Sequence, residues 1–297
     1  MSTVNNAELT LGSRASAYLA LTKPDVSFLV VLTTAAGYYM GVRGPVDWLH
    51  LVHAVFGTTL IAAGTAALNH YIERDSDAQM RRTASRPLPS GVLEPAEALV
   101  FGVSLAVVGA VDLWITAGLL GCALGVITCL SYLLAYTPLK KRTVWATFIG
   151  AFPGAIPPMI GWAAATGHLE RGAWLLFAIL FLWQFPHFHA IAWIYREDYA
   201  RAGILMLPVV DRDGTRTFRQ ILLAASALVA VSLLPAVIGL AGLRYFSGAL
   251  VLSAALVQMC LWASAVRSNQ RAKWLMHATV LHIPVLLGLM LYDKLPR

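Results

Sequence analysis

Three oxygen-bearing side chains stand at four-residue steps in the first half of the sequence: Asn69, Glu73 and Asp77. On a helix, four residues turn about 400°, so these side chains would form one ridge about 12 Å long. Amide and carboxylate oxygens on one face suit a hard cation such as Mg²⁺, which takes its remaining ligands from waters and substrate phosphates. The spacing therefore predicts a Mg²⁺ site that works together with a phosphate-bearing substrate.

Two basic runs accompany the ridge. The first follows it within 13 residues and contains Arg74, Arg81, Arg82 and Arg86. Arginine matches phosphate geometry, so this run favours a diphosphate over a bare metal ion. The second run contains Lys140, Lys141 and Arg142, and it suits either the same diphosphate or anionic lipid at a membrane edge. A solvated, mixed-charge loop is the alternative for the first run, but a ridge at the edge of an apolar segment favours function.

A third polar group follows a later apolar run. His187 and His189 differ by about 200° on a helix, so both cannot point into one cavity. His187 and Asp198 are 11 residues apart and share a face if the helix stays regular beyond Pro186. Glu197 and Asp198 could supply a second acidic cluster. Each histidine could also be a hydrogen-bonded packing residue, and the sequence does not decide between these roles.

The composition places these groups in a membrane protein. The chain has 297 residues, of which 58% are hydrophobic and 12% charged, whereas soluble domains carry about 25% charged residues. Disorder and a soluble globule are therefore excluded, and long apolar runs favour helices over a membrane barrel. We expect an all-α polytopic protein with nine transmembrane helices, near residues 25–42, 50–72, 96–115, 117–136, 144–165, 173–195, 219–240, 246–266 and 274–292.

The distribution of charge predicts the topology. With nine spans, 17 of the 22 basic residues fall on the side of the N-terminus, which places the N-terminus in the cytoplasm and the C-terminus outside. Residues 1–23 form a polar segment with an expected interfacial helix near residues 15–21, and residues 24–297 form one intramembrane domain. The spacing of the three cysteines suits neither a zinc site nor a disulfide framework.

The fifth predicted span is interrupted by proline. Pro153, Pro157 and Pro158 lie in its middle, and such breaks are tolerated in a membrane where the backbone is buried or lines a cavity. We expect a broken helix beside a cavity, and a packing kink is the alternative.

Taken together, these motifs resemble the UbiA superfamily of intramembrane prenyltransferases and, within it, the haem-directed branch of protohaem IX farnesyltransferases. The resemblance covers roughly residues 20–290. It rests on Asn69, Glu73 and Asp77, on Met80, Arg82, Thr83, Arg86, Pro87 and Leu88, and on the stretches 136–143, 154–162 and 183–188. Glu73 departs from the aspartate common in the superfamily. The aspartate-rich repeat of the quinone-directed relatives is also missing, which leaves the second metal position in doubt.

The resemblance implies nine helices around a central cavity and transfer of a farnesyl group from farnesyl diphosphate to the 2-vinyl group of haem B, giving haem O and diphosphate. Haem B would be a substrate, and Mg²⁺ the cofactor. We expect Asn69, Glu73, Asp77 and Asp198 to hold the metal and, with His187, to be catalytic. The expected diphosphate-binding residues are Arg82, Arg86, Lys140, Lys141 and Arg142, and the expected haem-binding residues are His187, His189 and Arg196.

His187 suits three roles: axial ligand of the haem iron, diphosphate contact or proton acceptor. The resemblance also implies a bacterial-type inner membrane with the active-site mouth on the cytoplasmic side, a partner that processes haem O or assembles an oxidase, and no nucleic acid. A sister prenyltransferase acting on an aromatic or quinone precursor is the nearest alternative, and an ion-coupled transporter is the alternative of another class.

Overall fold

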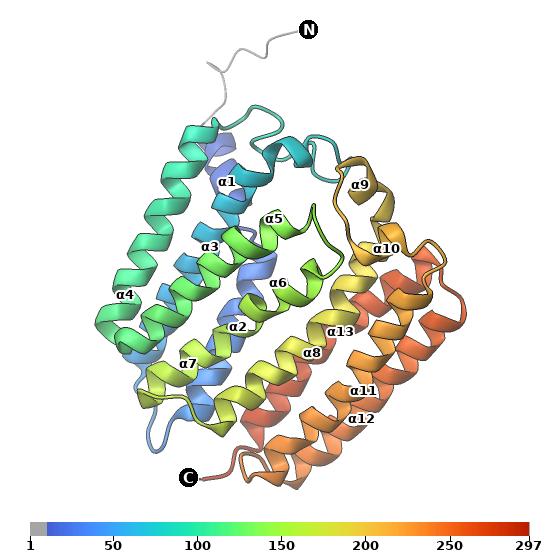
Figure 1. Cartoon of the computed structure of the whole chain (residues 1–297). Helices are drawn as coiled ribbons and strands as arrows, with labels where there is room; N and C mark the ends of the chain where they lie inside the picture. The colour runs from blue at the N-terminus through green and yellow to red at the C-terminus, as the bar shows by residue number, and fades with distance from the viewer. Residues whose placement is uncertain (1–10, 297) are drawn as a thin grey trace, which may run out of the picture.

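The computed structural model describes residues 11–296, and nearly all of this part of the chain is helical (Figure 1). Ten residues of the predicted N-terminal segment, 1–10, lie outside the described residues, and the rest of that segment carries α1. The helices in chain order are α1 (Leu11–Leu21), α2 (Pro24–Gly41), α3 (Trp48–Asp77), α4 (Pro95–Leu130), α5 (Thr137–Leu139), α6 (Ala146–Ala155), α7 (Pro157–Thr166), α8 (Arg171–Ile194), α9 (Arg196–Arg201), α10 (Leu207–Val210), α11 (Thr215–Val237), α12 (Leu243–Ala265) and α13 (Asn269–Tyr292).

The predicted all-α, multi-pass membrane architecture is confirmed. Within the described residues, seven helices are long and apolar enough to cross a membrane, or eight if the bent pair α1 and α2 counts as one span. One of the seven, Pro95–Leu139, has 45 residues and covers the third and fourth predicted spans. The count of nine and the orientation of the termini therefore stay predictions.

Glycine explains how one long helix covers two predicted spans. Gly118 has φ 70° and ψ −175° inside α4, a conformation that costs glycine little and other residues much. The chain reverses direction at the end of α4 that lies farthest from α5 (Figure 1). The returning arm ends in a π-helical segment, Ser131–Tyr136, and then α5. The return brings α5 to the same end of the bundle as α1 and α9.

The helices bury their apolar side chains in two main clusters. One joins α3, α4 and α7 through residues such as Ile61, Leu113 and Ile160, and the other joins α8, α11, α12 and α13 through residues such as Phe218 and Tyr245. These side chains pack inward, whereas many large apolar side chains on the outside of the bundle are exposed. That pattern is typical of a lipid-facing surface.

The fifth span is divided at its prolines, because α6 ends at Ala155 and α7 begins at Pro157. Ile156 between them keeps helical angles, with φ −74° and ψ −31°, and Ala146–Thr166 together is one candidate span. The break is accompanied by very close packing of α7 on α2. A Cβ atom on Gly37 would lie 2.0 Å from the Pro158 carbonyl oxygen, and one on Gly161 would lie 2.0 Å from that of Thr34. Only glycine permits such contact between two backbones. The close packing expected for a packing kink is therefore present at α7, and a cavity beside the break stays a prediction.

Candidate active site

The ridge exists as the spacing predicts, on the last turns of α3. Asn69 and Asp77 are each 1% exposed, and the Glu73 side chain is 14% exposed. Burying carboxylates this deeply is costly unless each has a partner. The ridge lies at the end of the bundle that also carries α1, α5 and α9 (Figure 1).

Each oxygen group of the ridge has its own base, supplied by a different part of the chain. The Lys23 Nζ donates to Asn69 Oδ1 at 2.9 Å. The Lys140 Nζ donates to both oxygens of Glu73, at 2.9 and 3.2 Å. An Arg86 guanidinium nitrogen donates to Asp77 Oδ2 at 2.8 Å. The ridge is therefore a row of oxygens that already bind cations.

Lys23 is a site residue that the sequence reasoning missed. It connects α1 to α2 with φ 48°, the one positive φ of a residue other than glycine in the described part of the chain. Burial lowers the pKa of its ammonium group to about 7, and repulsion from Arg86 and Lys140 acts in the same direction. The available signal was a base directly before Pro24, at the start of the first apolar run.

The structure separates the three bases of the second run. Lys140 is buried, pairs with Glu73, and has its ammonium group 4.4 Å from the centre of the Tyr136 ring. Lys141 and Arg142 are exposed, and their side chains have no ion pair or hydrogen bond with the described residues. The structure thus brings Lys140 to the ridge and leaves the other two bases at the surface.

The loop between α3 and α4 connects the ridge to α9. Met80 is buried in a small cluster with Ala202 and Ile204. The Arg81 backbone N–H lies 3.4 Å from Asp198 Oδ1, and Asp198 also pairs with Arg201. The Arg82 guanidinium group lies over the rings of Tyr195 and Tyr199, at 4.5 and 5.6 Å. The loop contacts therefore place Asp198 and Arg82 at the same end of the bundle as the ridge.

His187 has a defined tautomer. The Thr279 hydroxyl donates its proton to the Met276 carbonyl oxygen at 2.6 Å, so it accepts a hydrogen bond from His187 Nδ1 at 2.9 Å. The His187 ring also stacks on Trp183, with a centroid distance of 4.9 Å. Because the proton resides on Nδ1, Nε2 carries the lone pair and can accept a proton or bind a metal.

The other two residues expected to bind haem point elsewhere. The His189 Nε2 donates to Gln220 Oε1 on α11 at 2.8 Å, so the two histidines face different helices, as their angular separation predicts. Arg196 donates to the Trp193 carbonyl oxygen and to Asn269 Oδ1, each at 2.6 Å. The three side chains thus do not converge on one point.

A cavity of about 460 Å³ opens beside the ridge, lined by Ala20, Lys23, Pro24, Asp25, Val26, His70, Ser85, Arg86 and Pro87. Two of these residues, Lys23 and Arg86, are the bases bound to Asn69 and Asp77. Their charge makes the cavity suited to an anion larger than a single carboxylate.

The ridge fits a metal ion that shares its ligands with a substrate. Across residues 11–296, no three His, Cys, Asp or Glu side chains lie close enough together to cage an ion. Mg²⁺ is commonly held by one or two carboxylates together with substrate phosphates and waters. Asn69, Glu73 and Asp77 supply oxygen donors of this kind, and each already binds a cationic group.

The chain is similar to known proteins over most of its length. The model of the UbiA prenyltransferase family matches residues 30–283. A protoheme IX farnesyltransferase from Solibacter usitatus is 49% identical, over 93% of this chain and 98% of the relative. One from Koribacter versatilis is 46% identical, over 93% of both chains.

Solved structures share the fold at low sequence identity. A digeranylgeranylglyceryl phosphate synthase superposes with a TM-score of 0.78 at 18% identity, covering 94% of this chain and 98% of the other. A UbiA homologue from Archaeoglobus fulgidus bound to GPP and Mg²⁺ superposes with a TM-score of 0.65 at 15% identity, covering 92% and 99%. The chain belongs to the UbiA prenyltransferase family.

Proposed function

We propose that this membrane enzyme transfers the farnesyl group of farnesyl diphosphate to the 2-vinyl group of haem B, giving haem O and diphosphate. The names of its relatives give the reaction. The observation that carries the chemistry is the ridge with its three dedicated bases, Lys23, Lys140 and Arg86. Haem B is a substrate here.

Asn69, Glu73 and Asp77 would hold Mg²⁺ against the diphosphate. Asp198 would be a further carboxylate at the same end of the bundle. The ion would neutralise the charge that develops on the leaving group. Binding would release the three bases from the ridge oxygens, and the freed ammonium and guanidinium groups can then donate to the diphosphate oxygens. This exchange places positive charge where the leaving group becomes more negative, which stabilises the transition state.

The reaction balances with one water molecule. The C1–O bond of farnesyl diphosphate breaks, and its electron pair leaves with diphosphate. The vinyl π electrons of haem B form the new C–C bond, and water captures the resulting cation at the carbon next to the pyrrole ring. We assign His187 Nε2 as the acceptor of the proton that this water releases, because Thr279 holds the Nδ1–H tautomer.

The expected setting is a bacterial-type inner membrane, with the ridge at the cytoplasmic side. This orientation is supported by the excess of basic residues on that side of the predicted topology. A protein that processes haem O or assembles an oxidase is the proposed partner, since the product is too apolar to diffuse freely through water.

The function is tested with purified protein in nanodiscs, supplied with farnesyl diphosphate, Mg²⁺ and either haem B or a phenolic quinone precursor. Mass spectrometry of the porphyrin fraction should show haem B gaining one farnesyl group and one hydroxyl group. Prenylation of the phenol in place of haem would assign the chain to the quinone-directed relatives. Transport of an ion without any prenylated product would contradict enzymatic function.

A further inference from the structure

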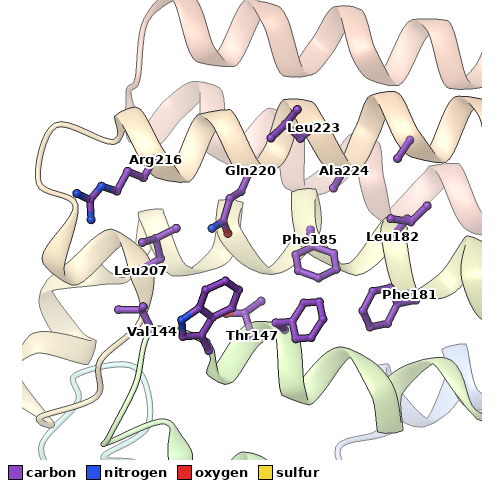
Figure 2. Close-up of a pocket in the computed structure, with 13 residues that line it drawn as sticks. Val144, Thr147, Phe181, Leu182, Phe185, Leu207, Arg216, Gln220, Leu223 and Ala224 are labelled. Carbon is purple, nitrogen blue, oxygen red and sulfur yellow. The ribbon is translucent and has the colours of Figure 1, made fainter.

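A second hollow lies on the outside of the bundle, away from the ridge. It has a volume of about 520 Å³ and runs over α8 between α6 and α11 (Figure 2). It is lined by Val144, Trp145, Thr147, Phe148, Phe181, Leu182, Phe185, Leu207, Arg216, Gln220, Leu223, Ala224 and Ala227. We call it the lateral groove, and no ridge residue lines it.

The walls of the lateral groove are apolar and open to the surroundings. Phe148, Phe181 and Phe185 contact one another edge to face or at a tilt, with centroids 5.4 to 6.2 Å apart. Trp145 at its head is 61% exposed, and Leu223 on α11 is 64% exposed. Such surfaces are stable when covered by lipid chains, and tryptophan favours the boundary between chains and headgroups.

Arg216 is a base at the head of the groove without an acidic partner among the described residues. Arg216 lines it, and its side chain points outward at the same end as Val144 and Leu207 (Figure 2). Four further exposed bases lie within four residues of Val144 or Arg216 in the sequence: Lys141, Arg142, Arg212 and Arg219. None of these five side chains has an acidic partner among the residues that the structure describes.

The neighbouring acids do not neutralise these bases. Asp211 is buried and accepts hydrogen bonds from the Thr217 N–H at 2.7 Å and hydroxyl at 2.8 Å. Asp213 accepts from Thr215 and lies 3.9 Å from Arg267. The head of the groove therefore carries net positive charge directly above an apolar channel.

The shape of the groove selects an extended occupant. On α11 the lining residues run from Arg216 to Ala227, which at 1.5 Å per residue is about 16 Å along the helix. An occupant with one negative headgroup and one long hydrocarbon chain matches both the length and the charge. We propose that the lateral groove binds an anionic phospholipid, with its phosphate at Arg216 and one acyl chain along Phe148, Phe181 and Phe185.

Haem is the rival occupant, and the lining argues against it. The groove contains no His, Cys or Met side chain that could bind iron. His189 contacts the lining residue Gln220, but it is buried and uses Nε2 for that bond. The lipid would join α6 to α11 across α8 and stabilise this side of the bundle.

The test is native mass spectrometry of the delipidated full chain, titrated with phosphatidylglycerol or phosphatidylcholine. We expect one phosphatidylglycerol to bind, and Arg216→Gln to weaken it about tenfold, the size of one charge-assisted hydrogen bond. Arg219→Gln is the matched control, because it loses the same charge on α11 but does not line the groove. It should weaken binding less than threefold.

A second pair of variants tests the channel without changing charge. Ala224→Phe fills the groove and should abolish the bound lipid, whereas Ser226→Phe, exposed on another face of α11, should retain it. Equal loss in Arg216→Gln and Arg219→Gln, or retention of lipid in Ala224→Phe, would overturn the proposal. So would haem binding that depends on Arg216 when phosphatidylglycerol binding does not. These readouts use no enzymatic activity, so they are independent of the proposed reaction.

Discussion

The ridge and the lateral groove both combine apolar surroundings with basic side chains, but the two sets of bases differ in their partners. Lys23, Arg86 and Lys140 are each within hydrogen-bonding distance of a ridge oxygen. Arg216 and its neighbours have no acidic partner among the described residues. The first set can exchange partners, whereas the second set is free to accept an anion directly.

This difference indicates how each site works. At the ridge, a metal ion alone would have to displace all three bases and leave Lys140 and Arg86 charged without partners in a largely buried site, which is costly. Metal and diphosphate together remove that cost, because the released bases gain the diphosphate oxygens. The ridge should therefore bind the two as a pair, while the groove should bind its anion without any metal.

The largest expected effect comes from the ridge itself. Asp77→Asn removes the charge of a ridge ligand without changing its size, and turnover should fall at least about 1000-fold. Asp75→Asn is the matched control, since its side chain is 83% exposed and off the ridge, and its turnover should be near normal. Product formation measured by mass spectrometry decides, and near-normal turnover in a folded Asp77→Asn protein would refute the metal ridge.

The next largest effect is expected within the second basic run, where Lys140 is paired and Lys141 is not. Lys140→Met leaves Glu73 buried without its base, which should destabilise the fold by about 3 kcal/mol and lower kcat/KM for farnesyl diphosphate about 100-fold. Lys141→Met should change neither quantity appreciably. Thermal unfolding and initial rates give both values, and similar losses in the two variants would contradict the pairing of Lys140 alone with Glu73.

The position of Lys140 illustrates what the sequence could and could not predict. The periodicity of Asn69, Glu73 and Asp77 predicts the ridge, because helix geometry alone sets that face. No such geometric rule predicts which of the three consecutive bases, Lys140, Lys141 and Arg142, contacts Glu73. That contact depends on how the turn after the π-helical segment is packed. Lys23 escaped prediction for the same reason, since its contact joins residues 46 positions apart.

The helix count shows a similar limit. Long apolar runs predict a multi-pass helical protein because the membrane requires them. The boundary between the third and fourth runs depends on Gly118, whose non-helical φ and ψ interrupt α4 where the chain reverses direction. Likewise, Met80 packs with Ala202 and brings the loop after α3 to α9, and no local pattern predicts such a tertiary contact.

A moderate effect is expected at His187, the proposed proton acceptor. Thr279→Val removes the group that accepts the His187 Nδ1–H, so the imidazole can change tautomer, and kcat should fall about tenfold. Thr279→Ser should restore the rate, and KM for farnesyl diphosphate should stay unchanged in both variants. Steady-state kinetics checks this, and an unchanged kcat in Thr279→Val would remove the proposed proton-acceptor role of His187.

The smallest expected effect is the uptake of a proton by Lys23 when Mg²⁺ and diphosphate bind. With a pKa of about 7, Lys23 is about 90% neutral at pH 8. Diphosphate would raise its pKa, so binding of Mg²⁺ and inorganic diphosphate at pH 8 should take up close to one proton, and Lys23→Met should abolish this uptake. Calorimetry in two buffers of different ionisation enthalpy measures it. Proton release, or equal uptake in the variant, would contradict the assignment.

The pairing of ridge oxygens with exchangeable bases is tested most directly by thermal unfolding of the purified full chain with Mg²⁺ alone, with inorganic diphosphate alone and with both. A ligand that binds only the folded state raises Tm. The ridge predicts that both ligands together raise Tm by clearly more than the sum of the separate shifts, and that Asp77→Asn loses this excess. If Mg²⁺ alone gives the full shift, the ridge is a preformed metal site and the exchange of partners is wrong.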